Sequence, residues 1–491
     1  MLPYSNANLL KTLRIIKANQ IMNQISIILL LLLTFNSYGQ KSEILAEPKV
    51  DERVELLSII FRLADSREYS SNRFPKYVEN IEKHFKPYKN HELIKYVKKK
   101  LRKKGIGYDA VMHMAISLTD KYPFRAIVPF SKEIPEERWG KKKANKFLHL
   151  LNKFYLDANC EKFFEDNQPL YETASGNFKK VYDELDVNWY QEFYGQKPKG
   201  EFRIVNGLGN GGGNYGPSIS INGKEFIYAI MGTWSVDSLS IPQYKVDDYF
   251  PTLLHEFNHS FVNHVVEKYH TELSKSGQLI FGVLKDKMES QAYGSWQTMY
   301  AEAVVRAGVI KYLKDHNYPS EFIETELNDE INRGFLWTDK LVQELERYGQ
   351  NREVFPTLES FMPELVKFFD KIADNMTEIE KEIDNRRPKV VEIKPFGNGN
   401  QIVNHNIKKM EIIFDRPLRG KGYSISEGEK GDKAFPKMGE ITYSEDNKSV
   451  FIELELKPDK EYQFVLTGWS FKSLNGYGIN NYEINFKTKK E

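Results

Sequence analysis

The stretch Tyr249–His264, which reads YFPTLLHEFNHSFVNH, decides how this sequence is interpreted. Its apolar residues recur at helical spacing, and Pro251 suits the first turn of a helix. On a helix, residues four apart lie one turn above each other, so His255 and His259 are expected to point to a common place. The pattern therefore predicts a helix that carries two imidazoles on one side.

Glu256 directly follows the first histidine and completes the motif HExxH. Two imidazoles at this spacing suit a Zn²⁺ ion, and Glu256 lies close enough to take a proton from a zinc-bound water. The alternative is an incidental histidine pair packed in the helix.

A catalytic zinc also needs a third protein ligand and one open position. Glu302, in the segment MYAEAVVRAGVIKYL, is the preferred choice because the small alanines around it permit close helix packing. Arg306 is expected to orient the Glu302 carboxylate, although the two residues could instead form an ordinary helix pair at four-residue spacing. Glu289 is the second choice of ligand. His264 is disfavoured, because it lies about 180° around the helix from His255.

Three further features of the sequence bear on catalysis. Tyr293, Tyr300 and Arg306 are candidates for the group that stabilises a developing oxyanion. The glycine-rich segment Gly209–Pro217 is interpreted as a flexible connection or the rim of a cleft. The Ser218–Gly232 segment, with Asn-Gly at its centre, predicts a hairpin whose edge could pair with an extended peptide.

These motifs resemble known families. LLHEFNHSFVN followed by MYAEAVVRA resembles the gluzincins, zinc peptidases that combine HExxH with a glutamate from a second helix. Roughly residues 47–375 resemble a family of exported bacterial proteins that share a domain of unknown function. This resemblance implies a zincin-like core and peptidase activity. The C-terminal segments MEIIFDRPL, VLTGW and INFKT resemble bacterial Ig-like domains.

Composition limits the remaining possibilities. A net charge of +2 gives no reason to expect a nucleic-acid partner, and the single cysteine, Cys160, excludes an intramolecular disulfide. The apolar run Ile25–Leu33 predicts a signal peptide over residues 1–39, with Met22 as an alternative start. An uncleaved anchor is the alternative. We therefore expect an exported protein, periplasmic, cell-surface or secreted, with no membrane span in the mature chain.

The predicted fold is multidomain α+β. It has a largely helical zincin-like metallopeptidase core with a small β-sheet, followed by a C-terminal Ig-like β-sandwich. Residues 40–199 are expected to form the helical part of the core, 200–385 the part with the HExxH helix, and 386–491 the sandwich. The predicted function is zinc-dependent hydrolysis of a peptide or protein substrate. The alternative is a non-catalytic binding or adhesion protein of the cell envelope that keeps the zincin fold.

Overall fold

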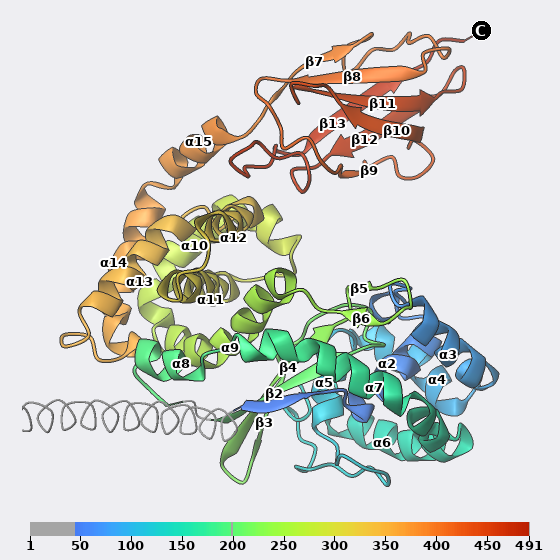
Figure 1. The fold of residues 1–491 in the computed structure, drawn as a ribbon, viewed down its shortest axis with the longest axis vertical. Helices are drawn as coiled ribbons and strands as arrows, with labels where there is room; N and C mark the ends of the chain where they lie inside the picture. The colour runs from blue at the N-terminus through green and yellow to red at the C-terminus, as the bar shows by residue number, and fades with distance from the viewer. Residues whose placement is uncertain (1–44, 198–199, 491) are drawn as a thin grey trace, which may run out of the picture. The chain divides into compact units, whose positions relative to one another are not determined.

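The computed structural model describes residues 45–197 and 200–490 (Figure 1). The predicted signal peptide, residues 1–39, lies outside the described residues. The chain divides into two compact units, the first ending at Ser260 and the second beginning at Phe261. No helix within the described ranges combines the length and apolar character that crossing a bilayer would require.

The first unit is mainly helical up to residue 194, as the apolar periodicity predicts. Its helices are α2 (Glu52–Leu63), α3 (Pro75–Phe85), α4 (Glu92–Tyr96), α5 (Asp109–Ile116), α6 (Gly140–Asp157), α7 (Cys160–Asp183) and α8 (Val187–Tyr194). The Asp51 side chain caps α2 by accepting a hydrogen bond from the Arg53 backbone nitrogen at 3.0 Å. Cys160 is buried in the core of this unit.

A small mixed sheet follows, in the order β1-β2-β4-β3. The strands β1 (Leu45–Lys49), β2 (Gly200–Gly207) and β4 (Lys224–Gly232) are parallel, and β3 (Ser218–Ile221) pairs antiparallel with β4 at the edge. Asn222 and Gly223 both have positive φ, 52° and 81°, as the predicted two-residue hairpin turn requires. Strand β1 was not predicted, because its sequence LAEPK is short and contains a proline.

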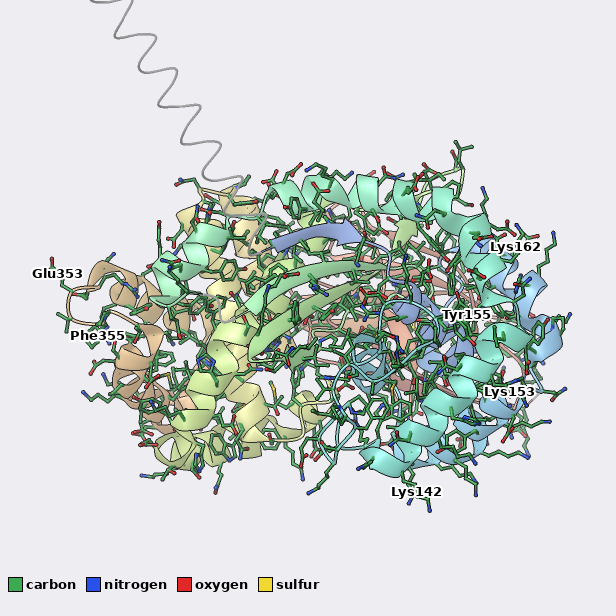
Figure 2. The ribbon with its side chains drawn as sticks, turned by 90° about the horizontal axis from the view of Figure 1, so that it is seen from below. Lys142, Lys153, Tyr155, Lys162, Glu353 and Phe355 are labelled. Atoms are coloured by element: carbon green, nitrogen blue, oxygen red, sulfur yellow. The ribbon has the colours of Figure 1, made fainter. Side chains whose placement is uncertain are left out.

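Helices cover this sheet. Helix α7 packs on β1 and β2, and α5 packs against β3. The basic residues of α6 and α7 stay in solvent: Figure 2 shows Lys142, Lys153 and Lys162 pointing outward, and all three are exposed. Two short strands, β5 (Ser235–Val236) and β6 (Pro242–Gln243), complete the connection to the next helix.

That helix, α9 (Val246–Lys268), carries the HExxH motif. The prediction that Pro251 opens the helix was wrong by five residues, since α9 begins at Val246 and Pro251 lies inside it. Pro251 cannot donate to the Asp247 carbonyl and its ring crowds that group, but it lies only one turn into the helix, after backbone bonds from Asp248 and Tyr249 to Lys245. Phe257 packs on Phe202 of β2 with 4.4 Å between ring centroids, which anchors this part of α9 to the sheet.

The second unit begins with packed helices and ends with strands (Figure 1). The helices are α10 (His270–Glu289), α11 (Trp296–Asp315), α12 (Ser320–Arg333), α13 (Thr338–Gln350), α14 (Leu358–Asp374) and α15 (Met376–Arg386). Helix α11 packs against α10, α12 and α13 and is buried along most of its length. The polar groups of α11 therefore need partners inside the protein.

Two antiparallel sheets enclose a second hydrophobic core at the C-terminal end, with orders β10-β11-β8-β7 and β13-β12-β9. Alternating buried and exposed residues, as in β8 and β11, match the alternation seen in the sequence. The strands are β7 (Val390–Lys394), β8 (Lys409–Phe414), β9 (Ile425–Glu427), β10 (Lys437–Tyr443), β11 (Ser449–Glu455), β12 (Glu461–Leu466) and β13 (Tyr482–Lys487).

Candidate metal centre

The three residues predicted as metal ligands lie together. His255, His259 and Glu302 each offer one ligand atom, and these atoms all lie within 4.8 Å of one another. The two histidines are partly exposed, whereas Glu302 is buried. This cluster could hold a metal ion.

The two imidazole rings turn the same type of nitrogen, Nε2, toward each other. Nε2 of His255 and Nε2 of His259 are 3.1 Å apart, and the ring planes are nearly perpendicular, at 86°. Two nitrogens bound to one tetrahedral zinc ion lie roughly 3.3 Å apart, since each Zn–N bond is about 2.0–2.1 Å. The spacing of the two Nε2 atoms therefore suits a shared cation.

The Glu302 carboxylate is held in place by two neighbours. Its Oε2 accepts a hydrogen bond from Arg306 Nη2 at 3.0 Å and one from the Tyr293 hydroxyl at 3.2 Å. Arg306 Nη2 also donates to the Tyr293 oxygen at 2.6 Å. Arg306 thus contacts the predicted third ligand inside the protein rather than as a surface pair, and its role in orienting that ligand stays a prediction.

Glu330, on α12, is the second carboxylate that contacts Arg306. The sequence pattern did not indicate it. Its carboxylate accepts from Arg306 Nη1 at 2.7 Å and also pairs with Arg333. Burial alone would lower the Arg306 pKa, but the charges of Glu330 and Glu302 outweigh burial and hold it above its ordinary value. Burial, followed by the charge of Glu302, raises the pKa of Tyr293 to about 12, so its hydroxyl stays protonated at neutral pH.

Glu256 faces the glycine-rich segment. A Cβ atom built on Gly216 would overlap Oε2 of Glu256, so the backbone of this segment approaches the carboxylate as closely as a residue without a side chain permits. Gly216 is a site residue that sequence reasoning did not single out, although the run of glycines around it was noted.

The glycine-rich segment is tied down. The buried carboxylate of Glu55 accepts hydrogen bonds from the backbone nitrogens of Leu208, at 2.7 Å, and Gly209, at 2.9 Å. Further along, the Trp234 indole nitrogen donates to the Gly212 carbonyl at 2.9 Å, and the Trp234 ring stacks on Tyr249 of α9. The segment therefore borders Glu256 as a positioned wall and is not a loose connection.

The remaining predicted residues are not part of the ligand cluster, although two of them contact it. Glu289 is exposed near the end of α10, faces Lys285, and is not in the cluster. His264 is not in the cluster either. Tyr300 is fully buried with its ring stacked on Phe369. Tyr293 and Arg306 contact Glu302, and a role for either in stabilising an oxyanion stays a prediction.

The donor set is chemically coherent. Two imidazole nitrogens and one carboxylate oxygen form a three-ligand set used by catalytic zinc sites, which keep a fourth position for water or substrate. A further carboxylate, Glu256, follows the first ligand directly in the chain. The described residues therefore fit a divalent metal ion with a carboxylate beside it in the sequence.

Comparison with known proteins supplies a family. The family model described as "Domain of unknown function (DUF4932)" matches residues 47–368, more than half of the chain. No curated protein matches the chain.

Parts of the chain are also similar to solved structures of a bacterial surface-layer protein. One, "Structure of surface layer protein SbsC, domains 1-6", is 14% identical with a TM-score of 0.17, over 51% of this chain and 34% of that chain. Another, "Crystal structure of the S-layer protein rSbsC(31-844)", is 13% identical with a TM-score of 0.17, over 80% of this chain and 46% of that chain. The chain thus spans less than half of each of these structures. These TM-scores do not indicate a shared fold.

Proposed function

This chain belongs to the DUF4932 family, and we propose that it is an exported zinc-dependent metallopeptidase with a zincin-like core. The convergence of His255 Nε2, His259 Nε2 and a Glu302 carboxylate oxygen is the observation that supports the proposal most directly. Export is proposed from the sequence alone.

In this proposal His255, His259 and Glu302 hold the zinc ion. A zinc ion with such ligands lowers the pKa of bound water toward neutrality and polarises a carbonyl group. Glu256 takes up a proton on its carboxylate and later passes it to the leaving nitrogen. Arg306 and Tyr293 keep the Glu302 carboxylate in one orientation through their bonds to its Oε2.

A peptide substrate suits the neighbouring sheet. Strand β3 is an edge strand that pairs only with β4 among the described strands, and its residues Ser218 and Ser220 are exposed. Such an edge can take an extended peptide by backbone hydrogen bonding. The strand follows Gly216 and Pro217 directly, so it starts beside the residue that contacts Glu256.

Residues 386–491 support a second candidate function, that of a non-catalytic binding or adhesion protein. We propose that these residues form an Ig-like sandwich. The orders β7-β8-β11-β10 and β9-β12-β13 match the A-B-E-D and C-F-G sheets of a constant-type immunoglobulin domain. Modules of this type serve as contact surfaces as readily as spacers.

Metal analysis and peptide cleavage together test the proposal. The purified mature protein is expected to carry one zinc per molecule, and His259→Ala is expected to carry none. His264→Ala, on the same helix but outside the cluster, is the matched control and should keep the metal. Wild-type protein without bound zinc would contradict the metal centre.

Glu256→Gln separates the two functions. We expect this variant to keep zinc and to lose hydrolysis of a peptide library by a factor on the order of 10² or more. Glu267→Gln, an exposed position on the same helix, is the control. If the wild-type protein binds zinc and cleaves no peptide in the library, the binding function is favoured instead.

A further inference from the structure

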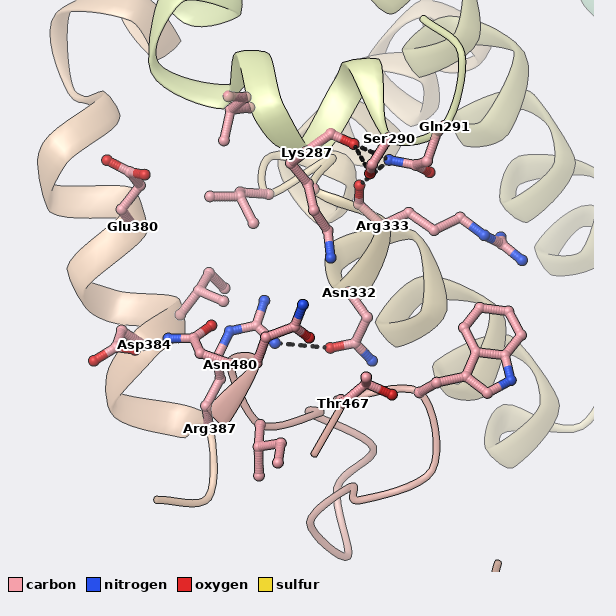
Figure 3. Close-up of a pocket in the computed structure, with 18 of the residues that line it drawn as sticks. Lys287, Ser290, Gln291, Asn332, Arg333, Glu380, Asp384, Arg387, Thr467 and Asn480 are labelled. Atoms are coloured by element: carbon pink, nitrogen blue, oxygen red, sulfur yellow. Dashed lines mark hydrogen bonds between the residues drawn. The ribbon is translucent and has the colours of Figure 1, made fainter. Parts of the chain in front are cut away.

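The second unit contains a large cavity that the metal centre does not use. It has a volume of about 1380 Å³ and opens between α10, α12, α15 and the chain that links β12 to β13 (Figure 3). His255, His259 and Glu302 do not line it, although one wall reaches Tyr293 and Arg306. The volume exceeds the roughly 300–1,000 Å³ typical of small-molecule pockets, so it would accommodate an oligomeric ligand.

Several cationic side chains line this cavity, and two of them, Lys287 and Arg387, come from separate elements. Figure 3 shows Lys287 on α10 and Arg387, just after α15, on opposite sides of the space. Within the described ranges, Lys287 has no hydrogen-bond or ion-pair partner for its ammonium group. Arg387 donates from Nη1 to Asn332 Oδ1 at 3.0 Å and to the Gly478 carbonyl at 2.7 Å, and no described carboxylate pairs with it.

Neither charge is fully compensated, because Asp384 offsets only part of the cost of burying the Arg387 guanidinium. Desolvation by the cavity wall lowers the pKa of Lys287, and the positive charge of Arg387 lowers it further. Burial also lowers the pKa of Arg387. An anion placed between two such groups would relieve their mutual repulsion and complete their hydrogen bonding.

The nearby carboxylates are largely engaged within the chain. Asp384 accepts from Lys389 at 2.8 Å and from Asn480 at 2.7 Å, and Asp329 pairs with Lys472. Asp286 and Glu380 also line the cavity, and Figure 3 shows Glu380 on α15 apart from the Lys287 ammonium group. The ammonium and guanidinium groups therefore remain available to a ligand.

The rest of the wall favours a sugar over a bare ion. Trp469 lines the cavity and is 70% exposed, with the Lys472 ammonium group 6.0 Å from its ring centroid, so most of the indole surface is accessible for stacking against the C–H face of a sugar ring. Thr467, Asn480 and Asn481 add hydroxyl and amide groups, which can both donate and accept hydrogen bonds. A wall of aromatic, amide and cationic groups matches a polyhydroxylated ligand that carries negative charge.

We propose that this cavity binds an anionic oligosaccharide, a sugar chain that bears carboxylate or sulfate groups. Lys287 and Arg387 bind the anionic group, Trp469 packs against a sugar ring, and the amide side chains bind hydroxyl groups. The inference is independent of the metal centre and does not depend on the proposed peptidase activity.

Titration calorimetry on the full mature chain tests this site with defined probes. The probes are an oligomer of uronic acids, a sulfated oligosaccharide, a neutral oligosaccharide of equal length and a poly-glutamate peptide. We expect at least one of the two anionic sugars to bind at least about tenfold more tightly than both the neutral sugar and the peptide. Which of the two binds better distinguishes carboxylate from sulfate. The His259→Ala variant should bind as the wild type does.

Variants assign the binding to the cavity. Lys287→Gln should weaken binding of the anionic sugar roughly tenfold, because a charge-assisted hydrogen bond is lost. Lys285→Gln, on the same helix but outside the cavity, is the matched control and should bind as the wild type does. Trp469→Ala should also weaken binding. Lys287 and Trp469 are both exposed, so we expect the two variants to fold. Unchanged binding in Lys287→Gln, equal binding of the neutral sugar or the peptide, or no sugar binding at all would overturn the proposal.

Discussion

At the scale of single residues, buried charges decide how the metal centre is arranged. Arg306 lies between Glu302 and Glu330, so the third predicted ligand belongs to a buried network and not to a surface pair. Such a network has one low-energy arrangement, because leaving any of its charges without a partner costs several kcal/mol. The network therefore presents the Glu302 carboxylate in a fixed orientation.

Tyr293→Phe tests the support of Glu302 with little change in volume. The substitution removes the hydroxyl that donates to Glu302 Oε2 and accepts from Arg306. We expect zinc affinity to fall about tenfold, measured by competition with a chelator of known affinity. Tyr269→Phe is the control, since its hydroxyl bonds to the Glu359 backbone, away from Glu302. Equal zinc affinity in the two variants would contradict the role given to Tyr293.

Glu55 gives the first unit a defined pH dependence. Burial raises the pKa of this carboxyl from 4.5 to about 7, against the opposing effect of its bonds to Leu208 and Gly209. Between these values the folded state holds a proton that the unfolded state has lost, so the free energy of unfolding falls as pH rises. Over the whole range, this pKa shift changes the free energy of unfolding by about 3 kcal/mol.

Glu55→Gln removes this titration. In denaturant unfolding followed by fluorescence, stability of the variant relative to the wild type should increase from about pH 5 to about pH 7 and then level off. The control is Glu79→Gln, an exposed position on α3 whose carboxyl makes no bond to the glycine-rich segment. A constant difference between Glu55→Gln and the wild type across this range would show that Glu55 titrates normally.

At the scale of elements, the glycine-rich segment and α9 act together. The segment is held by Glu55 at one end and by Trp234 further along, and Gly216 meets the Glu256 carboxylate. The close approach is possible only because residue 216 has no side chain.

Gly216→Ala is expected to displace the Glu256 carboxylate, because the new methyl group would occupy the same space as Oε2. Misplacement of a catalytic group by about 1 Å can reduce a rate by on the order of 10²-fold. We therefore expect peptide hydrolysis to fall by one to two orders of magnitude while bound zinc is unchanged. Gly282→Ala, at a helical position with open space around it, controls for the substitution itself. Full activity in Gly216→Ala would show that peptide hydrolysis does not depend on the observed position of the Glu256 carboxylate.

At the scale of the molecule, a single side chain of the second unit joins its helices to its C-terminal sheets. Asn332 on α12 donates from Nδ2 to the Gly476 carbonyl at 2.9 Å, and its Oδ1 accepts from the Gly478 nitrogen at 2.9 Å and from Arg387 at 3.0 Å. One amide therefore links the helices of this unit to a loop of its C-terminal sheets.

Asn332→Ala should weaken that link. Three hydrogen bonds are lost and their partners remain partly buried, so we expect a loss of about 2–3 kcal/mol in the coupling of the two parts. Calorimetry should show a lower melting temperature and a separate transition for the C-terminal sheets. Asn385→Ala, at an exposed position on α15, should melt as the wild type does. An unaltered single transition in Asn332→Ala would contradict this account of the link.

The sequence by itself determined the features that depend on local geometry. The 3.6-residue period of a helix puts His255 and His259 on one side, and the Asn222-Gly223 pair favours the hairpin turn. The alternating patterns beyond residue 386 likewise predicted strands, because each side chain of a strand faces opposite to the next.

Only the tertiary structure decided which distant residues meet. Glu302 could be weighed against Glu289 as a ligand but not distinguished from it by spacing, and Glu330, Gly216 and the pair Lys287 and Arg387 gave no local signal. The physical reason is that bond geometry sets the relation of residues within one turn or one hairpin. The relation of residues on separate elements is set by packing, in which many weak contacts must be satisfied at once.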